Sequence, residues 1–266
     1  MTLQSNAPSL LHDLLWQMAD DDFVVALRAS EWLGVAPHLE EDVAFSSIAQ
    51  DEMGHAAAYY GLLADLGAGP RDVLAHLRPA ADRRNSVLVE RQNGPGSYRE
   101  LPHFDWAYAL ARHYLYDTFE SLRLDRAVQS SYGPLAEVSR SIRREEHYHL
   151  LHHEAWLRAF EVERGADADA RRRLQHGFER AFADAGDLAY TAPWQSGWQH
   201  TGILPDAASL GAEWLERVTA RLVALNLDVP AAALFRNGRI GQHTPELDAI
   251  LGDASEVLRL EPAAAW

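Results

Sequence analysis

The chain of 266 residues contains neither cysteine nor lysine, and all 24 of its basic residues are arginine. The missing cysteine excludes disulfide bonds, a thiolate nucleophile, and zinc or iron–sulfur sites that use cysteine ligands. The missing lysine excludes Schiff-base catalysis through a lysine amine and the lysine of a P-loop. A metal site in this chain must therefore use ligands other than cysteine thiolates.

Long hydrophobic runs are also missing. No run approaches the roughly 18 apolar residues of a membrane-spanning helix, and residues 1–6 lack the basic start and apolar core of a signal peptide. The 39 acidic residues outnumber the 24 basic ones, which gives a net charge of −15. Such a charge repels phosphate backbones and anionic membranes. We therefore expect a soluble cytoplasmic protein that binds neither nucleic acid nor membranes.

The remaining composition is that of a folded globular protein, with 47% apolar and 24% charged residues. Apolar residues recur at helical spacing along most of the chain, and strand-type alternation is nearly absent. Four long helices are predicted, at about 9–33, 39–66, 104–131 and 135–163. Shorter helices are predicted at about 169–185, 206–226 and 245–259.

The connections between the long helices predict how they are arranged. Short breaks join each pair into a hairpin, and a crossover over residues 67–101 joins the two hairpins. Within the crossover we expect a short helix at Arg71–Leu77 and an extended stretch at Ser86–Glu90. One long crossover between two hairpins is the connectivity of ferritin-like four-helix bundles. We therefore expect an all-α fold with a single ferritin-like domain over residues 1–266, its core bundle at about 9–163 and its C-terminal helices at about 167–266.

Two Glu-x-x-His motifs interrupt the apolar faces of the second and fourth long helices. They are Glu52-x-x-His55 and Glu146-x-x-His149. Three residues along a helix turn about 300° and rise about 4.5 Å, so the carboxylate and the imidazole point the same way. A third match, Glu100-x-x-His103, contains Pro102 and lies in the crossover, so it is set aside. Because a buried carboxylate is costly unless it is paired or bound to a metal, two such motifs indicate a metal site.

Antiparallel packing predicts which acidic residue of the first helix faces Glu52. Residues equally far from the turn lie at the same level, and the turn near Ala36 pairs Glu52 with the run Asp20–Asp22. Asp22 is preferred because it shares the apolar face of its helix, and Asp20 and Asp21 stay as alternatives. Glu31 is excluded because it lies about 16 Å from the level of Glu52.

The same argument applies to the second hairpin, whose turn lies near Gly133. Asp117 and Glu120 are the mirror positions of the fourth-helix motif, and Asp117 is preferred because it lies on the apolar face of its helix. Glu120 stays as the alternative. Of the four histidines within 147–153, at most two are expected to be ligands, and the others are expected to face solvent.

The predicted ligand set combines four carboxylates with two imidazoles: Asp22, Glu52, His55, Asp117, Glu146 and His149. Four negative charges balance two divalent cations, and oxygen and nitrogen donors without thiolate suit iron or manganese. We therefore expect two iron ions, with manganese or another divalent metal as the alternative. The pattern assigns no organic cofactor and no catalytic residue.

Several segments resemble the PaaA/PaaC family, the ferritin-like subunits of ring-1,2-phenylacetyl-CoA epoxidase. The resemblance covers nearly the whole chain, and the C-terminal segments are similar to the PaaC type. The segments that carry it are Ser30–Gly34, Gln50–His55, Leu227–Pro230 and Asn237–Thr244. The resemblance implies a multicomponent monooxygenase in which PaaA carries the catalytic di-iron site, PaaC is its structural partner and a separate reductase supplies electrons.

The PaaA ligand pattern matches the six residues predicted here, with Asp22 at a position that is Glu in that pattern. Typical PaaC chains have lost most of these ligands, whereas this chain retains them. The resemblance thus implies a PaaC-like subunit with a di-metal carboxylate site, a PaaA-type catalytic subunit and other complex subunits as partners, and a homo-oligomer when the chain is alone. The alternatives are a catalytic di-iron oxygenase that acts on another aromatic or CoA-thioester substrate, and a non-catalytic scaffold with a vestigial site.

Overall fold

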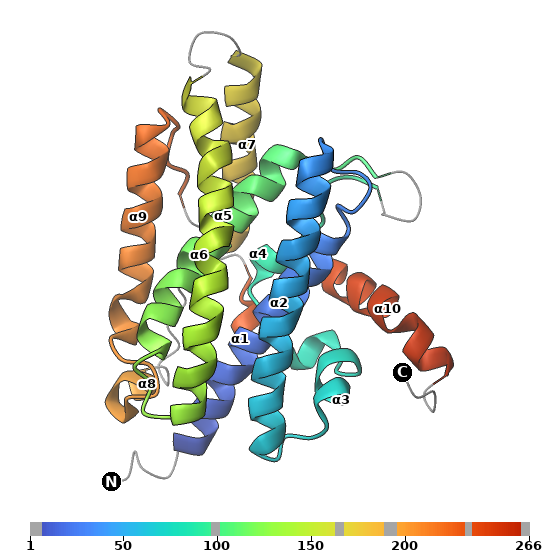
Figure 1. Ribbon diagram of the computed structural model, residues 1–266, viewed down its shortest axis with the longest axis vertical. Helices are drawn as coiled ribbons and strands as arrows, with labels where there is room; N and C mark the ends of the chain where they lie inside the picture. Colours follow the sequence, from blue (N-terminus) through green and yellow to red (C-terminus); the bar gives the residue numbers. More distant parts are fainter. Residues whose placement is uncertain (1–6, 97–101, 163–167, 189–195, 232–235, 262–266) are drawn as a thin grey trace. The chain divides into compact units, whose positions relative to one another are not determined.

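A computed structural model describes residues 7–96, 102–162, 168–188, 196–231 and 236–261 (Figure 1). Every regular element within these ranges is a helix or a 3₁₀ turn, which confirms the all-α fold class and agrees with a ferritin-like helical bundle. The chain divides into two compact units. The N-terminal unit contains Leu15–Gln92 and Asn237–Trp266, and the central unit contains Met1–Leu14 and Asn93–Arg236. The expectation that both belong to a single domain stays a prediction.

The N-terminal unit is built around the first predicted hairpin. Helix α1 spans Ala7–Ser30, and the part from Leu15 onward belongs to this unit. The other helices of the unit are α2 (Leu39–Asp65), α3 (Arg71–His76), α4 (Val87–Glu90) and α10 (Pro245–Leu260). Helix α1 ends a few residues earlier than predicted because the chain turns back at Gly34, whose φ of +82° favours glycine. The buried faces of α1 and α2 follow the predicted apolar spacing, with Met18, Phe45 and Tyr59 among the buried residues.

The crossover contains one element that the sequence analysis assigned wrongly. Residues Val87–Glu90 form a single helical turn rather than the expected extended stretch. The physical reason is a local cap, because the hydroxyl of Ser86 accepts a hydrogen bond from the backbone N–H of Leu88 at 3.2 Å. The expected short helix at Arg71–Leu77 is confirmed as α3.

The central unit is organised around α5 (Trp106–Ala127). Its other helices are α6 (Gly133–Val162), α7 (Ala168–Asp184), α8 (Ser196–Thr201) and α9 (Leu210–Ala224). Helices α6, α7 and α9 pack against α5 (Figure 1). Of the 22 residues of α5, 18 are buried, so most of its polar side chains, Asp117 and Glu120 among them, lie away from bulk water. The approach of α7 is close, since a Cβ on Gly177 would lie 2.6 Å from the carbonyl oxygen of Ala107.

In the part of the chain that the structure describes, no helix combines the length and the apolar character that crossing a bilayer requires.

Candidate metal centre

The three consecutive aspartates of α1 lie in different surroundings. Asp20 accepts hydrogen bonds from Nη1 of Arg78 at 2.8 Å, from the hydroxyl of Tyr60 at 2.6 Å and from the backbone N–H of Arg84 at 2.8 Å. Burial alone would raise the pKa of Asp20, but the charges of Arg78 and Arg83 outweigh burial and hold this pKa below its ordinary value. Asp20 is therefore an ionised partner of two arginines.

Asp21 binds the C-terminal segment of the same unit. Nη1 of Arg239 lies 2.7 and 2.8 Å from the two carboxylate oxygens of Asp21, and the backbone N–H of Ser86 donates to Oδ1 at 2.8 Å. Arg239 is 2% exposed, so this ion pair is almost fully removed from water. Asp20 and Asp21 thus serve ion pairs within the N-terminal unit.

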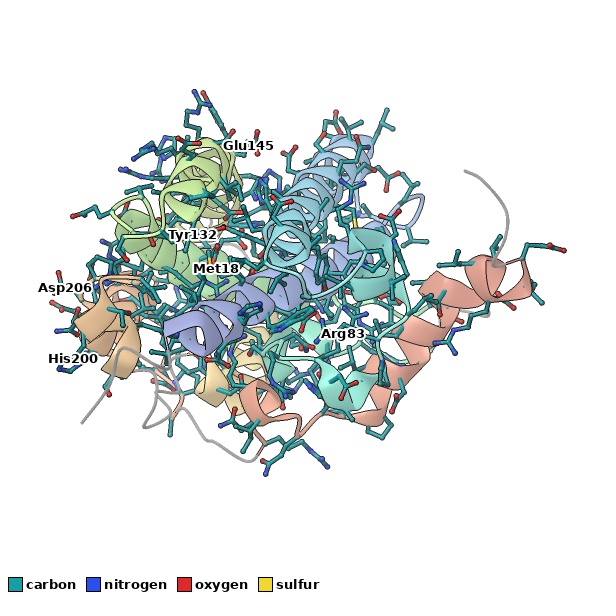
Figure 2. All side chains as sticks on the ribbon, turned by 90° about the horizontal axis from the view of Figure 1, so that it is seen from below. Met18, Arg83, Tyr132, Glu145, His200 and Asp206 are labelled. Carbon is teal, nitrogen blue, oxygen red and sulfur yellow. The ribbon has the colours of Figure 1, made fainter. Side chains whose placement is uncertain are left out.

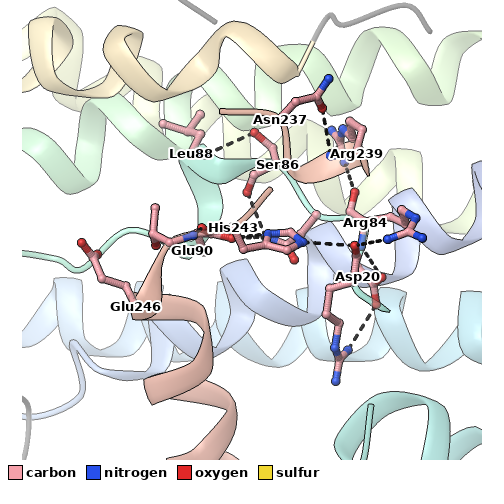
Figure 3. Close-up of polar contacts among 12 residues, drawn as sticks. Asp20, Arg84, Ser86, Leu88, Glu90, Asn237, Arg239, His243 and Glu246 are labelled. Atoms are coloured by element: carbon pink, nitrogen blue, oxygen red, sulfur yellow. Dashed lines mark hydrogen bonds and ion pairs between the residues drawn. The ribbon is translucent and has the colours of Figure 1, made fainter. Parts of the chain in front are cut away.

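A second anchor of the C-terminal segment is centred on Glu90 (Figure 3). Oε2 of Glu90 lies 2.7 Å from Nδ1 of His243 and accepts a hydrogen bond from the amide of Asn85 at 2.9 Å. The guanidinium of Arg28 donates to the backbone oxygen of Glu90 through Nε at 2.9 Å and Nη2 at 2.7 Å. The segment Asn237–Thr244, noted in the sequence as a family motif, therefore ties the end of the chain to the crossover.

Asp22 forms a buried cluster with the first Glu-x-x-His motif. One possible ligand atom from each of Asp22, Glu52 and His55 lies within 4.8 Å of the others. Nδ1 of His55 is 3.8 Å from Oε2 of Glu52, as expected for residues three apart on one helical face. Asp22 and Glu52 are 0% exposed and His55 is 3% exposed. Asp22, which the sequence favoured over Asp20 and Asp21, is thus the aspartate that lies beside this motif.

Glu31, which was excluded as a ligand on its distance from the level of Glu52, pairs with an arginine instead. It lies just beyond the end of α1 and forms an ion pair with Nη1 of Arg28 at 3.0 Å.

The second motif lies on the buried side of α6. Nδ1 of His149 is 3.3 Å from Oε1 of Glu146, and both side chains are almost fully buried. The neighbouring Glu145 lies on the outer side of α6 and is exposed (Figure 2). That this pair and the Asp22–Glu52–His55 cluster converge on one centre stays a prediction.

The two carboxylates proposed for α5 differ in their partners. Glu120 is ion-paired with Arg123, whose Nε donates to Oε2 at 2.5 Å. Asp117 lies with His113 and His153 instead, and its Oδ2 is 2.8 Å from Nε2 of His153. The arginine partner of Glu120 favours Asp117 over Glu120 as a metal ligand on this helix.

His113 and His153 are the site residues that the sequence analysis did not select. His153 was expected either to be one of at most two ligands or to face solvent, and the structure buries it completely, whereas His147 on the same helix is exposed. The four-residue spacing of these histidines from predicted ligands could have identified them. His113 is four residues before Asp117 and His153 is four residues after His149, so each continues the helical face of a predicted ligand.

Burial fixes the protonation state of His113. Burial lowers the pKa of His113 well below its ordinary value, and the nearby charge of Arg112 lowers it further. His113 is therefore a neutral imidazole at pH 7, which is the form that binds metal ions.

The donor atoms of these clusters fit a divalent metal of intermediate softness. Carboxylate oxygens and neutral imidazole nitrogens suit iron, manganese and zinc alike, so the residues fit a metal without fixing its identity. All of the donor side chains are buried on helices, which hold their positions more rigidly than loops do.

Comparisons with known proteins point to one family. Residues 2–266 match the model of the PaaA_PaaC family, described as phenylacetic acid catabolic protein. The C subunit of the 1,2-phenylacetyl-CoA epoxidase of Escherichia coli (strain K12) is 28% identical over 252 residues, which cover 94% of this chain and 96% of that protein. These matches confirm the resemblance seen in the sequence motifs. The chain therefore belongs to the PaaA_PaaC family of phenylacetic acid catabolic proteins.

Proposed function

We propose that this chain is a PaaC-like subunit of a phenylacetyl-CoA epoxidase-type complex that works in phenylacetate catabolism. The observation that carries this proposal is the similarity to the C subunit of such an epoxidase along nearly the full length of both chains. The similarity therefore includes the C-terminal segment that Asp21 and Glu90 anchor, and not the helical hairpins alone. A PaaA-type catalytic subunit and the other subunits of such a complex are the proposed partners.

We further propose that the chain retains a di-metal carboxylate site. Its proposed ligands are Asp22, Glu52, His55, Asp117, Glu146 and His149. Support comes from the burial of both Glu-x-x-His motifs and from the position of Asp22 beside the first of them. Buried carboxylates are costly without a cation, a proton or a hydrogen-bonded partner, and a pair of divalent cations supplies the first of these.

Two ferrous ions are the proposed occupants, with manganese or another divalent metal as the alternative. Bound iron would supply the electrons that activate dioxygen. The residues of this chain would bind the ions and fix their positions. His55 and His149 each offer a ring nitrogen, the carboxylates balance the metal charge, and the buried helix faces keep water away.

One alternative function has a specific observation behind it. A purely structural subunit has no need for metal ligands, yet both Glu-x-x-His motifs are intact and buried. The complete ligand set favours a second candidate, a di-iron oxygenase that itself acts on another aromatic or CoA-thioester substrate. A non-catalytic scaffold with a vestigial site is the remaining candidate.

A reconstituted complex separates these functions. The chain should co-purify with a PaaA-type subunit. A stable monomer that does not bind the PaaA-type subunit would contradict the proposed role. In the complex, Glu52→Ala removes one proposed ligand, and Glu40→Ala is the control on an exposed face of the same helix. Unchanged epoxidation with Glu52→Ala eliminates a catalytic role of this chain in the epoxidation. Lost epoxidation with intact assembly and an intact PaaA site eliminates the structural role.

A further inference from the structure

The central unit contains a histidine-rich cluster of which the di-metal proposal uses only Asp117. His113 and Asp117 lie on α5, and His153 lies on the neighbouring α6. All three side chains are 0% exposed. One possible ligand atom from each lies within 4.8 Å of the others. We propose that these three residues form a further, mononuclear site for a divalent transition metal, which shares Asp117 with the proposed di-metal centre.

The helix geometry suits shared coordination. His113 and Asp117 are four residues apart, so both side chains project from the same face of α5. His153 faces them from α6, with its Nε2 2.8 Å from Oδ2 of Asp117. Two ligands from one helix and a third from its packed neighbour surround a point between the helices, and three protein ligands leave a position open for water or substrate.

The distance between the imidazoles fits one shared ion. The ring centroids of His113 and His153 are 5.5 Å apart. An ion about 2.0–2.1 Å from each nitrogen lies about 3 Å from each ring centroid, so two imidazoles bound to it have centroids roughly 5 Å apart. The observed separation of the two rings is therefore close to the one that a shared ion requires.

The chemistry of the donors selects the class of ligand. Two imidazoles and one carboxylate suit zinc, iron(II) or cobalt(II), whereas calcium and magnesium prefer oxygen ligands. The site differs from the proposed di-metal centre because it gives one metal two histidines, whereas each Glu-x-x-His motif supplies a single histidine. Asp117 belongs to both proposals, and its carboxylate has two oxygens, of which Oδ2 faces His153.

Cobalt(II) binding tests this site without any activity assay. The background is Glu52→Gln/Glu146→Gln, which removes a glutamate from each motif and leaves the three residues of the new site intact. This variant should bind about one cobalt per chain, with X-ray absorption showing two imidazoles per metal. Adding His153→Gln should weaken cobalt binding by more than roughly 10–100-fold, which is the loss of metal affinity typical when a residue that only orients a ligand is replaced. His147→Gln, on the exposed face of α6, is the matched control and should change nothing.

The outcomes separate this site from the proposed function. No cobalt binding in the double variant, or binding that His153→Gln leaves unchanged, overturns the mononuclear site. If His153→Gln fails to fold, the imidazole count in the double variant still decides, because one imidazole or none overturns the proposal. The di-metal proposal fails in a different measurement: wild type and the Glu52→Gln/Glu146→Gln variant would then contain equal amounts of metal.

Discussion

Arg239 and Asp21, 218 residues apart in sequence, form a buried ion pair in which one guanidinium nitrogen lies 2.7 and 2.8 Å from the two carboxylate oxygens. This pair fastens the C-terminal segment to α1. Arg239→Met would leave the carboxylate of Asp21 buried without its cation, which costs about 3–5 kcal/mol of unfolding free energy. We expect a clear loss of stability in thermal and denaturant unfolding.

Arg71→Met is the control for this prediction. Arg71 and its partner Asp72 form an ion pair with side chains 58% and 79% exposed, and such surface changes stay within about 0.5 kcal/mol. Equal losses of stability in the two variants would contradict the anchoring role of Arg239.

The ion pairs of Asp20 predict how stability depends on pH. Its pKa is lower in the folded protein than in the unfolded chain, so its charge stabilises the fold above about pH 4 and this contribution declines as the pH falls toward the folded pKa. Asp20→Asn should therefore be less stable than wild type at pH 7, and the difference should narrow below about pH 4. Denaturant unfolding at a series of pH values measures this. A difference that stays constant down to acidic pH would contradict the ion-pair account.

Glycine at position 238 is required by a close backbone approach. A Cβ there would lie 1.9 Å from the carbonyl oxygen of Asn85, and backbone cannot move aside as a flexible side chain can. Gly238→Ala should destabilise by about 1–3 kcal/mol or more. Gly252→Ala lies within α10 with no atom within 4 Å of the new Cβ, so it should stabilise by about 0.4–1 kcal/mol. The same direction of change in both variants would refute the argument.

The sequence predicted the long helices because apolar spacing is a local signal that survives without tertiary information. The Glu-x-x-His motifs were visible for the same reason. The mirror rule for hairpins led to the run Asp20–Asp22, and the apolar face of the helix favoured Asp22 within it. The turn at Val87–Glu90 was missed because a single capping hydroxyl, that of Ser86, decides it.

Other features depend on residues far apart in the chain. The separate roles of Asp20 and Asp21 depend on Arg78 and Arg239, which no local pattern connects to α1. The cluster of His113 with His153 depends on the packing of α5 against α6. Only a folded chain shows which of several neighbouring acids and histidines meet.

Iron content is the measurement that tests the central claim most directly. After iron-supplemented expression, the wild-type protein and the Glu52→Gln/Glu146→Gln variant are compared for iron per chain, with helical content and melting temperature as checks on folding. A retained di-metal carboxylate site predicts that the variant carries about two fewer iron ions per chain than wild type. Equal iron contents in two folded proteins, or no iron in either, would contradict it.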